Sequence, residues 1–193
     1  MKICLFGAAS SLIDDIYINE VERLGKTLAK RGHSLVFGAG GTGVMGAAAR
    51  GIKSGGGKVL GVIPYFFREE AVELIFDDCD DLIYTESMRE RKKVMEDKAE
   101  AFIITPGGIG TFEEFFEVLT LKQLGRHTKP IAIYNINGYF DGLNNMLELS
   151  IKEKFLNKEC RSLYMFSDDP DKLFDYIESE DRVEYNLLKL KQS

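Results

Sequence analysis

The loop Pro106-Gly107-Gly108-Ile109-Gly110-Thr111 is the most specific chemical signal in the sequence. Three glycines in four positions let the backbone turn several amides toward one point. The helix expected after the loop adds unpaired N–H donors and the positive end of its dipole. We predict that Gly107, Gly108, Gly110 and the Thr111 hydroxyl hold a terminal phosphate, which needs no lysine at such a site.

Glu114 follows Thr111 by three residues, and this spacing allows two interpretations. Thr-x-x-Glu is the pattern of a helix capping box, worth about 1 kcal/mol to the helix and nothing to catalysis. However, the first turn of a helix at the carboxyl edge of a parallel sheet faces the crevice where such folds bind ligands. A carboxylate beside a phosphate loop suits a ligand group that carries positive charge, so we favour a role for Glu114 in the site.

Arg91 is the candidate partner of Glu114. A 3.6-residue period between Ser87 and Ala99 gives one apolar stripe, made of Met88, Val94, Met95 and Ala99. Arg91 falls in the middle of this stripe, where a guanidinium is rarely buried unless it is paired. It either extends to solvent or meets an anion, and we favour the anion. Lys92 and Lys93 are expected on a solvated face, although Lys92 is long enough to reach the cleft.

A second glycine loop, Gly38-Ala39-Gly40-Gly41-Thr42-Gly43, matches the G-x-G-x-x-G pattern of dinucleotide-binding proteins. That fingerprint also needs an acid about 20 residues later, at the end of the next strand. Here the strand ends Val62-Ile63-Pro64, which disfavours NAD. An ATPase loop is disfavoured further, because Gly51 lies one position too far from Gly57-Lys58 to give G-x-x-x-x-G-K. The alternative is that these glycines only allow a tight turn and close packing of a helix on the sheet.

The elements that must position these residues alternate along the chain. Short apolar runs rich in β-branched or aromatic residues predict strands at Ile3–Phe6, Ser34–Phe37, Lys58–Ile63, Leu82–Tyr84, Ala101–Thr105 and Ile131–Tyr134. Helical patterns predict helices near 14–31, 43–54, 88–99, 112–125 and 139–156, with a last one after Asp169-Pro170. Near-continuous apolar strands joined by helices are typical of a sheet covered on both faces. We predict an α/β fold, a Rossmann-like doubly wound parallel sheet in three layers.

Composition sets limits on the partners and the compartment. The 193 residues fit one domain spanning 1–193. A net charge of -6 argues against nucleic acid as a partner, and no apolar run reaches the roughly 18 residues of a membrane span. Residues 1–9 are interpreted as a strand and not as a signal peptide. The three cysteines suggest a reducing cytoplasm, and the two histidines, His33 and His127, lack metal-ligand spacing and are expected to be structural.

Three segments concern packing more than chemistry. The helix expected at 112–125 carries apolar residues on more than one side, which predicts contact with a second subunit, and the alternative is a helix buried within one monomer. The connection 64–80, which begins Pro64-Tyr65-Phe66-Phe67, is expected to supply core or partner contacts more than a lid. The tail from Arg182 shows no chemistry.

The motifs together resemble the LOG ("Lonely guy") family, cytokinin riboside 5'-monophosphate phosphoribohydrolases. Residues 106–114 match P-G-G-x-G-T-x-x-E, and Met88-Arg89-Glu90-Arg91-Lys92 matches the upstream M-x-x-R-K. The resemblance continues through Phe37–Gly46, Gln123–Pro130 and Asn137-Gly138-Tyr139-Phe140, and covers roughly residues 1–145. Two loops depart from the family pattern. Gly7-Ala8-Ala9-Ser10 replaces C-G-S-S and leaves Ser10 as the hydroxyl there, and Ala39 replaces a glycine of the second loop.

The resemblance implies a Rossmann-like homodimer that cleaves the N-glycosidic bond of a nucleoside 5'-monophosphate to free base and ribose 5-phosphate. It implies that Arg91 and Glu114 are the catalytic pair and that no metal or cofactor is required. Substrate contacts are expected from Ser10, Gly41, Met88, Lys92, Gly107, Gly108, Gly110 and Thr111. The base stays open among adenine, an N6-prenylated adenine and another purine, so AMP is the default assay substrate.

The resemblance also brings two alternative functions with it. Many family members have carried the name lysine decarboxylase, but that reaction normally requires pyridoxal phosphate on a Schiff-base lysine, for which the sequence offers no convincing loop. The other alternative is a nucleotide or molybdenum-cofactor carrier without turnover, because such carriers resemble this fold. The presence of both Arg91 and Glu114 favours the enzyme.

Overall fold

The structure, a computed structural model, describes residues 1–70 and 74–179 and contains one parallel sheet of seven strands. The strands are β1 (Lys2–Phe6), β2 (Ser34–Phe37), β3 (Val59–Pro64), β4 (Asp81–Thr85), β5 (Ala101–Ile104), β6 (Ile131–Tyr134) and β7 (Met165–Ser167), in the order β4-β3-β2-β1-β5-β6-β7. Six of them were expected. β7 was not, because three residues carry too little pattern to be recognised.

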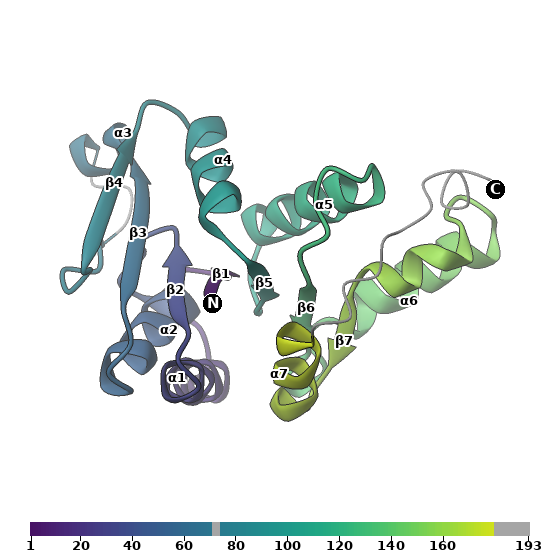
Figure 1. Ribbon diagram of the computed structural model, residues 1–193, viewed down its shortest axis with the longest axis horizontal. Helices are drawn as coiled ribbons and strands as arrows, with labels where there is room; N and C mark the ends of the chain where they lie inside the picture. Colours follow the sequence, from purple (N-terminus) through teal and green to yellow (C-terminus); the bar gives the residue numbers. More distant parts are fainter. Residues whose placement is uncertain (71–73, 180–193) are drawn as a thin grey trace.

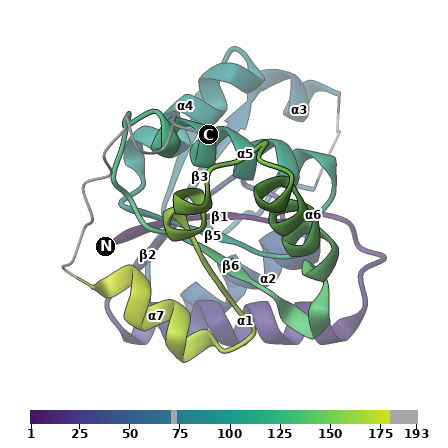
Figure 2. The same ribbon diagram turned by 90° about the vertical axis from the view of Figure 1, so that its right-hand side faces the viewer.

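Helices cover both faces of this sheet (Figures 1 and 2). They are α1 (Asp15–Lys30), α2 (Gly43–Ser54), α3 (Tyr65–Glu69), α4 (Met88–Lys98), α5 (Ile109–Gln123), α6 (Asp141–Lys152) and α7 (Pro170–Glu178), with 3-10 turns η1 (Ile136–Gly138) and η2 (Lys158–Leu163). Figure 2 shows α1, α2 and α7 below the strands and α4 and α5 above them. The doubly wound three-layer fold is therefore confirmed.

The core follows from the alternation of side chains along the strands. In β1, Ile3 and Leu5 enter a cluster with α1, α2 and α7, while Cys4 and Phe6 enter a second cluster with α4 and α5. All four are buried, as a sheet covered on both faces requires. All three cysteines are free.

The start of α5 differs from the expectation. The helix begins at Ile109, not near Phe112, and Gly108 is its N-cap residue. Phe112 N–H donates to the Gly108 carbonyl oxygen at 3.1 Å, so Thr111 is the third helical residue and the Thr111–Glu114 capping box does not form. The glycines let the chain enter the helix three residues early, which leaves the first helical amides without a side-chain cap.

The fold places the other packing segments as follows. In the 64–80 connection, Phe67 is buried in the core, Phe66 packs against it, and exposed Tyr65 stacks on Tyr84 with ring centroids 5.1 Å apart. α6 runs from Asp141 to Lys152, inside the range near 139–156 that was expected, and the turn before it has positive φ at Asn137 and Gly138. Across the described ranges, no helix has the length and apolar character needed to cross a membrane. The tail from Arg182 lies outside the described residues.

Candidate active site

A cavity of about 240 Å³ lies at the carboxyl ends of the central strands. Its lining consists of Gly7, Ala8, Ala9, Met45, Phe67, Met88, Arg91, Gly108, Gly110, Thr111, Glu113 and Glu114. The sheet order reverses between β1 and β5, and the loops that follow these two strands meet where Ala8 N–H donates to the Pro106 carbonyl oxygen at 3.2 Å. Such a switch point is where open α/β sheets bind ligands.

Arg91 enters this cavity from the first turn of α4. Its N-cap residue, Ser87, accepts a hydrogen bond from Glu90 N–H, which starts the helix in place. Arg91 is only 5% exposed, and it donates to the carbonyl oxygens of Val62 and Gly38 at 3.2 and 3.1 Å. The guanidinium also lies over the Phe67 ring, 5.5 Å from its centroid.

Among the residues that the structure describes, these contacts leave the Arg91 charge without a counter-ion. The ion pairs among the described residues give it no carboxylate within 4 Å. A buried guanidinium that is hydrogen-bonded to carbonyl groups keeps its full charge for an anionic ligand. The structure therefore excludes the extension of Arg91 to solvent that the sequence allowed, and its charge is available to an anion.

Glu114 lies in the second turn of α5 and lines the same cavity as Arg91. Burial raises the pKa of the Glu114 carboxyl to about 7, and the nearby Arg91 charge opposes that rise. Glu113 and Glu117 add to the rise, while Lys92 opposes it. A carboxyl group with a pKa near neutrality can both accept and return a proton in the physiological range.

The 106–111 loop offers a set of free amides. Within the described part of the chain, the N–H groups from Gly107 to Thr111 donate to no main-chain carbonyl. A β-carbon at Gly107 would lie 2.1 Å from Thr111 Oγ1, so only glycine fits there. A β-carbon at Gly108 or Gly110 would meet nothing within 4 Å, and the space beside these glycines is open to a ligand.

The structure brings six of the ten expected site residues together in the lining, and four lie outside it. Met88, Arg91, Gly108, Gly110, Thr111 and Glu114 line the cavity, and Gly107 adjoins it in the loop. Lys92 instead forms ion pairs with Glu113 and Glu117. Ser10 is exposed and accepts a hydrogen bond from Leu12 N–H at 3.2 Å. Gly41 N–H donates to the Leu74 carbonyl oxygen at 2.6 Å.

Six lining residues were not predicted as members of the site: Gly7, Ala8 and Ala9 of the first loop, and Met45, Phe67 and Glu113. Phe67 lies three residues after the carboxyl end of β3, so its place after a predicted central strand was a usable signal. Met45 lies in the first turn of α2, just after the 38–43 glycine loop, and had the same signal. Glu113 had none, because it looks like any helix carboxylate.

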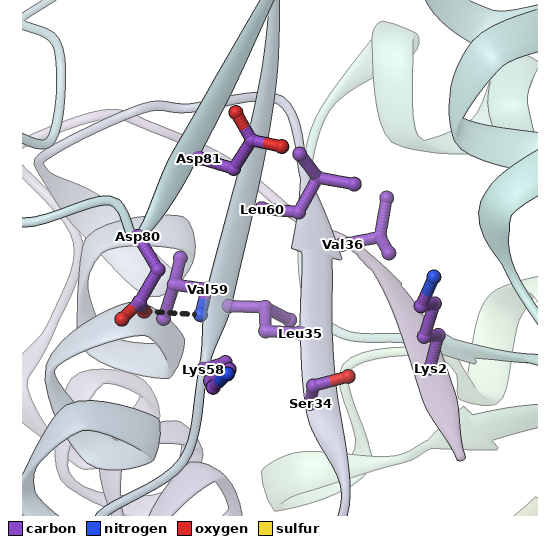
Figure 3. A pocket seen from close by; sticks show the side chains of 9 residues that line it. All are labelled: Lys2, Ser34, Leu35, Val36, Lys58, Val59, Leu60, Asp80 and Asp81. Carbon is purple, nitrogen blue, oxygen red and sulfur yellow. Dashed lines mark hydrogen bonds between the residues drawn. The ribbon is translucent and has the colours of Figure 1, made fainter.

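A second hollow, of about 190 Å³, lies at the opposite edge of the sheet (Figure 3). It is lined by the amino-terminal ends of β1 to β4 and includes Lys2, Lys58, Asp80 and Asp81. Asp80 accepts a hydrogen bond from Val59 N–H at 2.8 Å, and all four charged side chains belong to exposed residues. This hollow has no glycine loop or buried charge, so it offers no comparable chemistry.

The fold is shared with solved structures of low sequence identity. The molybdenum cofactor binding protein from Rippkaea orientalis superposes with a TM-score of 0.69 at 19% identity, covering 92% of this chain and 94% of that one. The molybdenum cofactor carrier protein of Chlamydomonas reinhardtii gives a TM-score of 0.66 at 22% identity, covering 89% and 92%. At these identities the likeness concerns the fold alone.

Sequence relatives are closer. Cytokinin riboside 5'-monophosphate phosphoribohydrolase LOG2 of Arabidopsis thaliana is 34% identical over 177 residues, covering 92% of this chain and 82% of the relative. The enzyme named LOG from Oryza sativa subsp. japonica is 34% identical over 162 residues, covering 84% and 65%. A family model described as "Possible lysine decarboxylase" matches residues 45–177. On these matches the chain belongs to the LOG family.

Proposed function

We propose that this protein is a nucleoside 5'-monophosphate phosphoribohydrolase, which hydrolyses the N-glycosidic bond of a purine nucleotide to free base and ribose 5-phosphate. The observation that carries the proposal is the juxtaposition of Arg91, Glu114 and the 106–111 glycine loop around one cavity. The names of the relatives that are 34% identical support the same reaction.

The loop supplies the anchor. The free amides of the 106–111 loop and the Thr111 hydroxyl are suited to a 5'-phosphate at the start of α5. Anchoring the phosphate fixes the ribose in the cavity and converts the attack of water into an oriented step. Met45, Phe67 and Met88 give the cavity soft apolar walls for a base.

Glu114 then acts at the sugar. As the bond between C1' and the base nitrogen breaks, its electron pair leaves with the base and the sugar becomes oxocarbenium-like. The Glu114 carboxylate stabilises that positive charge and takes a proton from the attacking water, whose oxygen bonds to C1'. The departing base nitrogen gains a proton, which balances the hydrolysis. Arg91 favours the ionised form of Glu114 and offers its uncompensated charge to the ligand.

The residues of the cavity do not fit a lysine decarboxylase, the activity that the family model names. A pyridoxal-dependent decarboxylase needs a lysine for the Schiff base. The described lining of the cavity contains Arg91 but no lysine, and Lys92 beside it is paired with two glutamates. We therefore derive no step through pyridoxal phosphate.

Turnover of AMP by the wild type and by Glu114→Gln tests the proposal. Glutamine preserves the size and helical position of the side chain but cannot carry the charge, so we expect a stable fold and loss of adenine release by at least 100-fold. Calorimetric titration of the variant with AMP should still detect binding. Undiminished turnover by Glu114→Gln would contradict the role of Glu114.

The same experiment separates the enzyme from a carrier. The fold is shared with molybdenum-cofactor carriers, whose function is binding. Wild-type protein that binds AMP tightly and releases no adenine would favour a nucleotide carrier. If the wild type does turn over AMP, its kcat/KM values for nucleotides that differ only at the N6 position of the base will show whether it prefers adenine or a prenylated adenine.

We also propose that the protein is a homodimer. The C-cap of α5 and the helix α6 present apolar side chains to solvent, among them Leu124, Met146 and Leu149, which are 41%, 48% and 55% exposed. A second subunit would remove these side chains from water. Sedimentation velocity at micromolar concentration should show a dimer, and a clean monomer would contradict the proposal.

A further inference from the structure

Tyr139 links the turn before α6 to the 106–111 loop. Its hydroxyl donates to the Gly107 carbonyl oxygen at 2.6 Å, across 32 residues of sequence. Tyr139 does not line the cavity, so it has no place in the chemistry described above. The contact is nevertheless made to the main chain of the residue that begins the run of free amides.

The tyrosine ring is held in place from several directions. Asn135 is buried and accepts a hydrogen bond from Phe140 N–H at 2.7 Å, while its amide donates to Asp141 at 2.8 Å. The Tyr139 ring meets the rings of Tyr17 from α1 and Phe140 edge to face, with centroids 5.9 and 5.0 Å apart. The hydroxyl is thus held by ring packing and by the turn that precedes α6.

This contact controls the direction of an amide in the loop. The described chain has no cis peptide bond, and in a trans peptide the carbonyl oxygen and the following N–H point in opposite directions. The Gly107 oxygen is held by Tyr139, so the Gly108 N–H points away from Tyr139. Gly108 lines the cavity, and its N–H donates to no carbonyl of the described residues.

The preceding peptide is fixed in the same way. The Pro106 carbonyl oxygen accepts a hydrogen bond from Ala8 N–H at 3.2 Å, which orients the Gly107 N–H. Two successive peptide planes are therefore set by partners outside the loop before any ligand arrives. A glycine loop without such contacts would lose conformational freedom on binding, and that loss weakens affinity.

We propose that Tyr139 is a positioning residue that preorganises the 106–111 loop for the 5'-phosphate of the substrate. The proposal rests on the proposed function, because it assigns the phosphate to this loop. It deepens that function by naming a residue that acts on affinity for the phosphate through Gly107, without touching the substrate.

The test compares Tyr139→Phe with wild type. Phenylalanine keeps the ring and its edge contacts and removes only the hydroxyl. We expect the KM for AMP and the inhibition constant of ribose 5-phosphate to rise about tenfold, with kcat changed less than twofold. Inhibition by adenosine, which lacks the phosphate, should be unchanged. Tyr65→Phe is the matched control, because Tyr65 is 48% exposed against 42% for Tyr139 and lies outside the cavity.

The outcomes separate this proposal from the proposed function. An unchanged inhibition constant for ribose 5-phosphate, or equal weakening of adenosine, would overturn the role of Tyr139 while AMP turnover by wild type stands. If wild type binds AMP without turnover, the proposed hydrolase function is wrong. The affinity of Tyr139→Phe for ribose 5-phosphate, compared with that of wild type, still decides the role of Tyr139. If Tyr139→Phe does not fold, Tyr17→Leu removes an edge contact of the same ring and should weaken ribose 5-phosphate in the same direction.

Discussion

The guanidinium of Arg91 lies directly against the main chain of Gly38. Its Nη2 donates to the Gly38 carbonyl oxygen at 3.1 Å, and a β-carbon built on Gly38 would sit 1.6 Å from that nitrogen. The missing side chain at position 38 is therefore what gives the guanidinium its place. In this protein the first glycine of the G-x-G-x-x-G pattern accommodates an arginine from α4.

Gly38→Ala should displace Arg91 and reduce activity with little loss of stability. The new methyl group collides with the end of a flexible side chain and with no main-chain atom, so the guanidinium can move aside. A displacement of about 1 Å at a catalytic group can cost on the order of 100-fold in rate. We expect kcat/KM for AMP to fall at least tenfold while the melting temperature stays near that of wild type.

Gly142→Ala is the control for this substitution. Gly142 lies in the first turn of α6, and a β-carbon there would meet nothing within 4 Å. Alanine in a helix is favoured over glycine by roughly 0.5–1 kcal/mol, so this variant should be slightly more stable and fully active. An active Gly38→Ala enzyme would mean that the position of Arg91 does not limit the reaction.

Stability and activity should respond to pH in opposite directions through Glu114. Its pKa is raised to about 7 by burial, so the folded state holds a proton that the unfolded chain releases near pH 4.5. Between these values the folded protein binds more protons, and the free energy of unfolding falls as pH rises. Activity requires the ionised carboxylate, so kcat/KM should rise with pH and level off above about pH 7.

Glu114→Gln isolates this effect from other groups. Burial also raises the pKa of Glu96 to about 7, so the pH dependence of wild type alone is not specific to Glu114. Denaturant unfolding of both proteins from pH 5 to pH 8 should show the variant gaining stability relative to wild type, on the order of 3 kcal/mol at the upper end. A difference that does not change with pH would mean that Glu114 titrates normally.

Much of the fold could be predicted because local pattern and tertiary environment agree. Strands such as Ile131–Tyr134 are buried on both faces and therefore consist of continuous apolar runs. The short strand β7 could not be found this way, since its three residues, Met165–Ser167, are too few to form a recognisable apolar run. The start of α5 was misplaced because helix-start rules favour Thr111, whereas the chain uses Gly108 and leaves its amides free.

The site was predictable to the extent that its residues lie in local motifs. Arg91 stood out as a charge on an apolar stripe, and Glu114 as a carboxylate next to a glycine loop. The carbonyl partners of Arg91, at Gly38 and Val62, are 53 and 29 residues away and have no side-chain signal. The pairing of Lys92 with α5 was equally invisible, because a lysine reveals its partner only when two helices are placed side by side.

Lys92 should set the electrostatics of Glu114 from outside the cavity lining. It bridges Glu113 and Glu117, and Lys92 Nζ lies 2.5 Å from the buried Oε2 of Glu117. Lys92→Met removes a charge that lowers the pKa of Glu114 and leaves two carboxylates facing one another. We expect the rise of kcat/KM with pH to move to higher pH, together with a loss of at least 1 kcal/mol in stability.

Lys93→Met is the matched control for Lys92. The Lys93 side chain is 75% exposed and pairs with Asp97 on the surface of the same helix, whereas that of Lys92 is 12% exposed. Surface pairs at this spacing contribute about 0.3–0.5 kcal/mol. Lys93→Met should therefore leave the pH profile unchanged, and a profile that moves equally in both variants would assign the effect to net charge.

Glu178 should anchor α7 through its ionised carboxylate, and this anchoring should be lost at acidic pH. Its carboxylate accepts two hydrogen bonds from Arg31, at 2.7 and 2.6 Å, and lies 2.8 Å from His33 Nε2. The Arg31 hydrogen bonds lower the pKa of Glu178 to about 2, against an ordinary value of 4.5. The contribution to stability is thus complete above about pH 4.5 and is lost as pH falls toward 2.

Glu178→Gln should destabilise the protein at pH 7, because it removes the charge of the bidentate pair with Arg31. The loss should be only roughly 1–2 kcal/mol, since solvent weakens a partly exposed pair. Denaturant unfolding at pH 7 and pH 3 measures this, and the difference between variant and wild type should shrink at the lower pH as the wild-type carboxylate is protonated. Glu153→Gln, at an exposed carboxylate just after α6, should change stability at neither pH. An equal deficit for Glu178→Gln at both pH values would show that the size and shape of the side chain anchor α7, and that its charge does not.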